Sequence, residues 1–285
     1  MASEAVAKRA SDKPAPAPSP AVPSESAPLF APLRDLDRKG KLLIAGLILL
    51  ANIPLIHYFF RHVLRPMPVS AQVPFSDSFD RADVGPNYWS TGGDWRIEHG
   101  WLHAAGVKNN PLWLKASLPQ NVAIDFDAKG TAAGDIKFEL FGDGLNHGSG
   151  YVFMFGGWNN QLTAIARYDE RSLAFNAQGV GLSGPANDAA QNAVSGRSLR
   201  ELYANHTLGP SSGWRVQRGG ERVQPGTTYH MHIERRGGDI KWMIDGNLVL
   251  EVDDPSPLTG SKHDRFAFSG WEASVFYGHL TIQKL

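Results

Sequence analysis

Residues 239–252, DIKWMIDGNLVLEV, decide the fold class of the larger part of this chain. Two runs of alternating apolar and polar residues flank Asp245-Gly246-Asn247. An Asp-Gly pair between two such runs is a strong signal for a β-hairpin. We therefore expect antiparallel strands at Asp239–Ile244 and Leu248–Val252.

The same period-two pattern continues on both sides of this hairpin. It predicts a hairpin of Asn121–Ala128 with Asp135–Phe141, joined by the loop 129–134, and another of Tyr151–Phe155 with Leu162–Tyr168. Further strands are expected at Pro74–Phe79, Asp94–Glu98, Trp101–Ala105, Pro111–Ala116, Thr228–Glu234, Arg265–Ser269 and Ser274–Gln283. About a dozen strands with turns between them are typical of an all-β sandwich of two antiparallel sheets.

The alternation also assigns the faces of the strands in the first of these hairpins. Val122, Ile124, Phe126, Ala128, Ile136, Phe138 and Leu140 should face the core. Asp125, Asp127, Asp135, Lys137 and Glu139 should face outward. The stretch 178–226 breaks the pattern, since it is rich in Gly, Ser and Asn. We expect a long insertion at the rim, with one helix at Ser198–Asn205, and long loops of this kind often carry function.

Four longer stretches resemble a known fold family. FSDSFDRADVGPNYWSTGGDWRIEHGWLHA (75–104) resembles the opening of concanavalin A-like jelly-roll domains. PGTTYHMHIERRGGDIKWMIDGNLVLEVDDPSPLTG (225–260), HDRFAFSGW (263–271) and SVFYGHLTIQKL (274–285) resemble their C-terminal half. The pattern is similar to laminin-G-like modules and to 3-keto-disaccharide hydrolase-like and glucanase-like domains of exported bacterial proteins. The resemblance implies a jelly roll over residues 74–285, but because this fold hosts lectins, lyases, glycosidases and adhesion modules, it does not imply one activity.

A separate segment, LLIAGLILLANIPLIHYFF (Leu42–Phe60), has 19 residues and no charge. A helix of this length spans about 28 Å, close to the thickness of the hydrocarbon core of a bilayer. We predict a transmembrane helix at 41–62, followed by a linker at 63–73. A cleavable signal peptide ending at Val69-Ser70-Ala71 and a buried soluble helix are the alternatives, but the run is longer than the apolar h-region of a usual signal peptide.

The charges that flank this helix predict its orientation. Arg34, Arg38, Lys39 and Lys41 precede it, whereas only Arg61 and Arg65 follow. The positive-inside rule then places the N-terminus in the cytoplasm and the C-terminal domain on the extracytoplasmic side. Residues 1–40, rich in Ala, Pro and Ser, should form a disordered cytoplasmic tail.

Composition excludes several function classes. The 28 basic and 28 acidic residues balance, so there is no charge signature of nucleic-acid binding. The absence of cysteine excludes disulfides, thiolate catalysis and thiolate metal sites. His230 and His232 have a spacing compatible with zinc or copper but lack a third ligand nearby. No cofactor is predicted; calcium stays open because Asp77, Asp80, Asp253, Asp254 and Asp264 lie in or near loops, although none forms a recognisable calcium loop.

The sequence predicts no catalytic residues, except under the alternative that the protein is an enzyme. If the protein is a glycoside hydrolase, Asp125, Asp127 and Glu139 would supply the carboxylates, because two such groups must flank a glycosidic bond. Laminarinase-type enzymes of this fold family carry an E-[ILV]-D-x-x-E strand. The corresponding stretch here, 123–128, begins with Ala123 and lacks the glutamates, so this mechanism is disfavoured.

Sugar recognition needs an aromatic face and planar polar groups. The predicted ligand-binding residues are Trp158, Asn159 and Asn160 at one hairpin tip, Arg167 on the following strand, and Asp143 and His147 in the loop before. The sequence therefore predicts a single-pass membrane protein that binds a carbohydrate or another envelope component without catalysis. A glycoside hydrolase and a protein–protein scaffold that uses the insertion and the tail remain as alternatives.

Overall fold

The computed structural model describes residues 36–62, 68–131, 134–172, 174–176, 199–219 and 222–285. The chain divides into two units, Met1–Arg65 and Pro66–Leu285. Most of the predicted tail, residues 1–35, lies outside the described residues.

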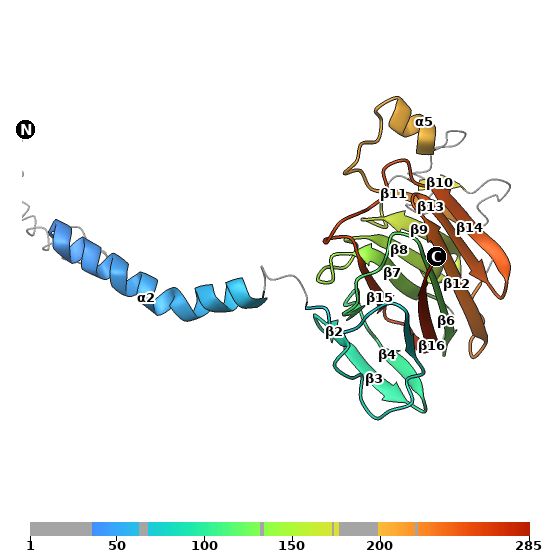
Figure 1. Cartoon of the computed structure of the whole chain (residues 1–285), viewed down its shortest axis with the longest axis horizontal. Helices are drawn as coiled ribbons and strands as arrows, with labels where there is room; N and C mark the ends of the chain where they lie inside the picture. The colour runs from blue at the N-terminus through green and yellow to red at the C-terminus, as the bar shows by residue number, and fades with distance from the viewer. Residues whose placement is uncertain (1–35, 63–67, 132–133, 173, 177–198, 220–221) are drawn as a thin grey trace, which may run out of the picture. The chain divides into compact units, whose positions relative to one another are not determined.

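The first unit contains helix α2 (Arg38–His62), drawn in blue in Figure 1. Its segment Arg38–His57 is long and apolar enough to cross a membrane by length and composition, with a mean hydropathy of 1.7. Large side chains such as Leu43 and Leu55 are each 65% exposed, so the described residues of this unit do not cover its apolar surface. One N-terminal apolar helix is thus present where the sequence predicts it.

The second unit is a sandwich of two eight-stranded sheets, which we call sheet A and sheet B (Figure 1). Sheet A contains β1 (Phe75–Asp77), β3 (Asp94–Glu98), β4 (Trp101–Ala105), β6 (Val122–Gly130), β12 (Thr228–Arg236), β13 (Asp239–Ile244), β14 (Asn247–Asp253) and β16 (Ser274–Lys284). Sheet B contains β2 (Tyr88–Ser90), β5 (Leu112–Leu114), β7 (Ile136–Gly142), β8 (Tyr151–Gly156), β9 (Leu162–Arg167), β10 (Ala174–Asn176), β11 (Trp214–Gly219) and β15 (Arg265–Gly270). The strand pairs described are antiparallel except β10–β11, which is parallel. The predicted all-β two-sheet sandwich is confirmed.

Aromatic side chains fill the space between the sheets. Phe126 of sheet A meets Phe138 of sheet B edge-on, with ring centroids 5.0 Å apart. Trp242 of sheet A packs in the same way against Phe138 and Phe153, at 5.5 and 5.4 Å. The inward-facing residues predicted for β6 and β7 all lie in this core. Such edge-to-face packing adds to the stabilisation from apolar burial.

One predicted hairpin is wrong. β6 pairs with β12 and β16 in sheet A, whereas β7 pairs with β8 and β15 in sheet B. The chain therefore changes sheets between the end of β6 at Gly130 and the start of β7 at Ile136, and the two strands do not form a hairpin. The error has a physical reason: period-two alternation fixes which side of a strand faces the core, but strands on opposite sheets satisfy it equally well.

The other two hairpins are confirmed as β8–β9 and β13–β14. The insertion is only partly a rim loop. It contains the short helix α5 (Leu199–Ala204), as predicted, but Trp214–Gly219 forms β11, which pairs with β9 inside sheet B. Residues 177–198 of the insertion lie outside the described residues. The short strands β2 and β10 were not predicted.

Candidate functional site

A cluster of charged side chains lies on the outer face of sheet B, the face directed away from the core. β7 places Lys137 and Glu139 there, and β15 places Ser269 directly opposite Lys137. These side chains are nevertheless buried: Lys137 is 3% exposed, and Glu139 and Ser269 are fully covered. Loops add the rest of the cluster, which we call the Lys137 site: Asn109, Asp135, Lys137, Glu139, His147, Glu170, Ser269 and Trp271.

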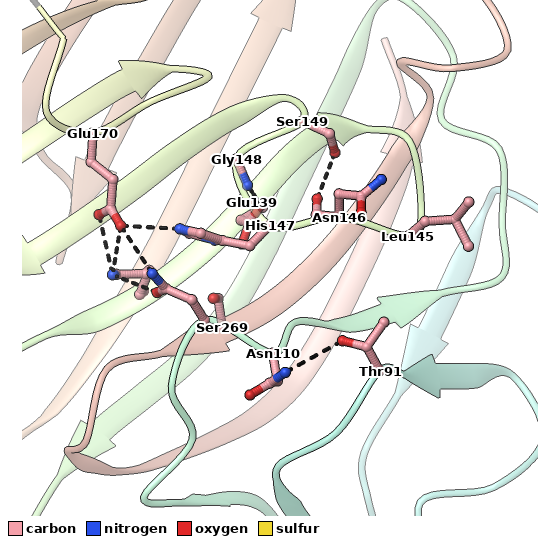
Figure 2. Close-up of polar contacts among 12 residues, drawn as sticks. Thr91, Asn110, Glu139, Leu145, Asn146, His147, Gly148, Ser149, Glu170 and Ser269 are labelled. Atoms are coloured by element: carbon pink, nitrogen blue, oxygen red, sulfur yellow. Dashed lines mark hydrogen bonds and ion pairs between the residues drawn. The ribbon is translucent and has the colours of Figure 1, made fainter. Parts of the chain in front are cut away.

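His147 links two carboxylates of this site, as Figure 2 shows. Its Nδ1 lies 2.6 Å from Oε1 of Glu139, and its Nε2 lies 3.0 Å from Oε1 of Glu170. The backbone N–H of Gly148 donates to the other oxygen of Glu139 at 3.0 Å. Glu139 is therefore held by two donors, one on each carboxylate oxygen.

Lys137 contacts three further polar groups of the site. Its Nζ lies 3.2 Å from Oε2 of Glu170 and 3.5 Å from Oδ2 of Asp135. It also donates to Oδ1 of Asn109 at 3.2 Å. One ammonium group thus holds two carboxylates and an amide on the partly exposed side of the site.

Burial and pairing set the protonation states of these groups. Burial works against a charged His147, but its hydrogen bonds to Glu139 and Glu170 outweigh this and raise its pKa to about 9. Burial alone would raise the pKa of Glu170, yet the hydrogen bond from His147 and the charge of Lys137 lower it to about 2. For Asp135, burial dominates and raises the pKa to about 6. At neutral pH His147 is an imidazolium that donates from both ring nitrogens.

Trp271 lies beside this polar network. Its indole is 46% exposed, and the ammonium group of Lys137 lies 5.9 Å from the ring centroid. A half-exposed tryptophan next to fixed polar groups is the combination that sugar recognition requires: one apolar surface and several directed hydrogen-bonding groups.

Two polar atoms of the site have unused hydrogen-bonding capacity. Oγ of Ser269 and Oδ1 of Asp135 are buried and have no hydrogen-bond partner among the described residues. A buried polar atom without a partner costs about 1–3 kcal/mol, so such atoms mark places where a ligand or water can bind favourably.

Of the six predicted ligand-binding residues, the structure places His147 in the Lys137 site. Asp143 lies in the same loop but shapes its turn: its Oδ1 accepts from the backbone N–H groups of Leu145 and Asn146, each at 2.7 Å. This turn presents His147 and Gly148 to Glu139. Close approach of the chain requires Gly150 here, because an added Cβ would lie 2.4 Å from the carbonyl oxygen of Leu140.

Arg167 and Asn160 are engaged elsewhere. Arg167 is 2% exposed and donates to Tyr203 and to the carbonyl oxygens of Pro210, Ser212 and Ser256, so it ties the insertion to the sandwich. The Asn160 amide donates to the carbonyl of Val223 and accepts from its N–H, both at 2.8 Å. These side chains hold parts of the fold together through their hydrogen bonds.

Trp158 and Asn159 lie at the tip of the β8–β9 hairpin, in the short helix α3 (Gly157–Asn160). Trp158 is partly buried against Val152, Met154 and neighbouring alanines, and the guanidinium of Arg215 lies 4.4 Å from its ring. Asn159 is exposed. The predicted ligand-binding set is therefore not one cluster.

The structure also separates the three carboxylates considered for hydrolysis. Asp125 and Asp127 lie on the outer face of sheet A, whereas Glu139 lies on the outer face of sheet B. The whole sandwich stands between them, so they cannot act on one glycosidic bond. This correction follows from the crossing between β6 and β7.

Asp125 and Asp127 pair with histidines instead. His232 Nδ1 lies 2.6 Å from Asp125, and His230 Nδ1 lies 3.0 Å from Asp127. No group of three or more His, Asp or Glu residues in the described part of the chain is arranged to hold a metal ion. Of the aspartates considered for calcium, Asp77 pairs with Arg81, and Asp254 accepts a hydrogen bond from Tyr151.

Sequence reasoning missed Asn109, Asp135, Lys137, Glu170, Ser269 and Trp271 as members of a site. The only sequence signal for Asp135 and Lys137 was their predicted position on the outer face of the strand, which does not distinguish a site residue from a solvent-exposed one. Glu170 lies in a turn, whereas Trp271 forms an isolated β-bridge with Lys108 directly after β15. Only the fold brings the two residues together.

Comparisons with known proteins find only distant similarities. No protein-family model matches the chain, and no characterised protein sequence matches it. A carbohydrate-binding module, CBM66 of Bacillus subtilis, is 13% identical, with a TM-score of 0.44 over 71% of this chain and 98% of that chain. A putative glycosyl hydrolase of Parabacteroides distasonis is 14% identical, with a TM-score of 0.44 over 73% and 92%. A prokaryotic β-1,3-1,4-glucanase (lichenase) from a mouse hindgut metagenome is 11% identical, with a TM-score of 0.43 over 74% and 99%.

The domain is a sandwich of two facing eight-stranded sheets, as the sequence predicts. The architecture alone does not define an activity. Function has to be argued from the Lys137 site.

Proposed function

We propose that this protein is a membrane-anchored, extracytoplasmic module that binds a carbohydrate at the Lys137 site without catalysis. The observation that carries the proposal is the half-exposed indole of Trp271 beside a fixed network of carboxylates, an amide and an ammonium group. The indole would stack on the C–H face of a sugar ring. Asp135, Asn109 and Glu170 would bond its hydroxyl groups.

The charges of the site favour a neutral or cationic sugar. With pKa values of about 6 for Asp135 and about 2 for Glu170, both of these carboxylates are ionised at neutral pH. The two partly exposed carboxylates, Asp135 and Glu170, lie on the accessible side, while Lys137 is buried behind them. An anionic sugar would meet like charge there.

The protonation states support binding over hydrolysis. A glycosidase needs one carboxylic acid that can give a proton and a second carboxylate that is free to act as base or nucleophile. Glu139 is fully buried and held by His147 and Gly148, and Glu170 is neutralised by Lys137 and His147. Glu139 is therefore not free to act in catalysis, and Glu170 could act as a base only if it gave up its contacts with Lys137 and His147.

A glycoside hydrolase is the second candidate, on one observation. The pKa of Asp135 is raised to about 6 by burial, and Glu170 stays ionised on the other side of the same Lys137 ammonium. Two carboxyl groups with divergent pKa values fit the roles of acid and base. A hydrolase would thus use Asp135 and Glu170 in place of the three carboxylates predicted from the sequence.

The anchor in this proposal is α2. Its exposed apolar surface and the excess of basic residues before it support a single crossing with the N-terminus in the cytoplasm. The chain has no cysteine, so single introduced cysteines can test the orientation without background. A cysteine at Asp253→Cys in intact cells should react with an impermeant thiol reagent, whereas one at Ser11→Cys should not.

The test of binding uses the full chain in lipid nanodiscs, incubated with a panel of insoluble and soluble glycans that includes cell-wall material. Each sample is assayed for bound protein and for new reducing ends. The proposal predicts binding without new reducing ends. New reducing ends would support the hydrolase, and neither signal would favour a protein partner, as the scaffold alternative requires.

Trp271→Ala should weaken this binding about thirtyfold, because losing a central aromatic anchor typically costs about 2 kcal/mol. The matched control is Trp101→Ala, since Trp101 is a partly exposed tryptophan on β4, on the outer face of sheet A. Equal losses in both variants would contradict the placement of the sugar.

A further inference from the structure

Asn52 lies near the middle of the uncharged run Leu42–Phe60, whose central residue is Ala51. In a helix that crosses the bilayer, this position is the one farthest from water on both sides. A polar side chain there must find its hydrogen bonds within the membrane.

The helix itself satisfies only part of the hydrogen-bonding capacity of the Asn52 amide. Nδ2 of Asn52 donates to the carbonyl oxygen of Ile48 at 2.7 Å. No other hydrogen bond of the Asn52 amide occurs within the described residues. One N–H and the whole acceptor oxygen are left without a partner, and the hydrocarbon offers none.

Asn52 also belongs to a continuous helix face. Ala45, Ile48, Asn52 and Leu55 follow the alternating spacing of three and four residues by which two helices pack along their length. Ile48 and Leu55 are 59% and 65% exposed, so the described residues of the helix's own unit do not cover this face. The run carries no charge that would oppose the approach of a second helix.

We propose that this face pairs with the same face of a second copy of the chain, with the two Asn52 amides bonded to each other. The inference rests on the proposed membrane anchor. All copies insert in one orientation, so Asn52 lies at the same depth in each of them. An amide has both a donor and an acceptor, so two Asn52 side chains related by a twofold axis complement each other.

The pair would have a consequence for sugar binding. A parallel pair places two sandwich domains on the same side of the membrane, and two linked sites hold a polymeric ligand more tightly than one. Dimerisation through α2 would thus strengthen binding to a polysaccharide without any new contact in the Lys137 site.

The experiment measures self-association of the full chain in lipid vesicles. Ser11→Cys supplies one labelling position for donor and acceptor dyes, and energy transfer is followed as lipid is added. Asn52→Leu should weaken dimerisation about 3- to 30-fold, the range found for polar contacts between membrane helices. Asn52→Gln keeps the amide and should retain pairing within about threefold. Leu50→Ala changes the opposite side of the helix and should have no effect.

Two results would overturn the proposal: energy transfer at the random level in the unmodified chain, or equal dimerisation by the chain with Asn52→Leu. Resistance to alkaline carbonate washing is measured on the same vesicles. A chain that washes off would refute the membrane anchor and the pair together. A chain that stays but does not pair would refute the pair alone.

Discussion

Replacing Glu139 by Gln tests whether the Lys137 site is a built network or a chance gathering of charges. The substitution keeps the shape of the side chain and removes its charge. Each oxygen of Glu139 accepts one hydrogen bond, from Nδ1 of His147 at 2.6 Å and from the N–H of Gly148 at 3.0 Å. Glutamine has one acceptor oxygen, so its NH₂ group must face one of these two donors.

The cost follows from this mismatch. Loss of a charged hydrogen bond costs about 1.5–3 kcal/mol, and a buried donor left without a partner adds about 1–3 kcal/mol. Breaking a buried ion pair by removing one partner costs about 3–5 kcal/mol. His147 is partly exposed and would still be paired with Glu170, so the expected cost lies at the lower end of this range. We expect Glu139→Gln to lower the free energy of unfolding by about 3 kcal/mol, and therefore the Tm by about 6–12 °C for a domain of this size.

The assay is thermal unfolding of the full chain in nanodiscs, followed by tryptophan fluorescence. Glu234→Gln is the matched control, because Glu234 also faces a histidine, His232, at 3.5 Å but on the exposed outer face of sheet A. Its substitution should change the free energy of unfolding by less than about 0.5 kcal/mol. If Glu139→Gln has an effect as small as the control, the network does not hold the site together.

Two further predictions concern pH. The pKa of His147 is raised to about 9, so its stabilising charge is fully present below its unfolded pKa of about 6.5 and is lost as the pH rises through 9. The free energy of unfolding should fall by up to about 3 kcal/mol between about pH 6.5 and about pH 9. His147→Asn should flatten this dependence on pH. An unchanged slope in that variant would contradict the assignment of the pH dependence to His147. The pKa of Asp135 is raised to about 6 by burial, so ionisation destabilises the fold above about pH 4. Asp135→Asn should therefore stabilise the domain by up to about 3 kcal/mol at pH 7, with the gain fading towards pH 4. Asparagine tolerates the positive φ of 52° at this position. A loss of stability at pH 7 would show that the attraction of Lys137 outweighs burial.

The sequence predicts the strands well because burial on one face imposes a two-residue period that can be read directly. Asp239–Ile244, Asp94–Glu98 and Trp101–Ala105 form strands with the predicted bounds. It does not predict the partners of every strand. β6 and β7 follow each other along the chain and both alternate, yet they belong to opposite sheets. Only the long-range pairing with β12 and β15 decides this.

The Lys137 site was harder to predict for the same reason. Its members come from segments as distant as Asn109 and Trp271, and an outward-facing Lys137 looks in the sequence like a residue in water. The structure buries it at 3% exposure. His147 was predicted because its loop is polar, whereas Arg167 was predicted for its residue type and proved to be a buried structural donor.

The most direct test of the central claim is to locate the bound sugar by hydrogen exchange of the full chain in nanodiscs, with and without a glycan that it retains. The account predicts added protection at β7, in the loop of His147 and around Trp271. Protection confined to β6 and β12, on the outer face of sheet A, would contradict the assignment of the sugar to the Lys137 site.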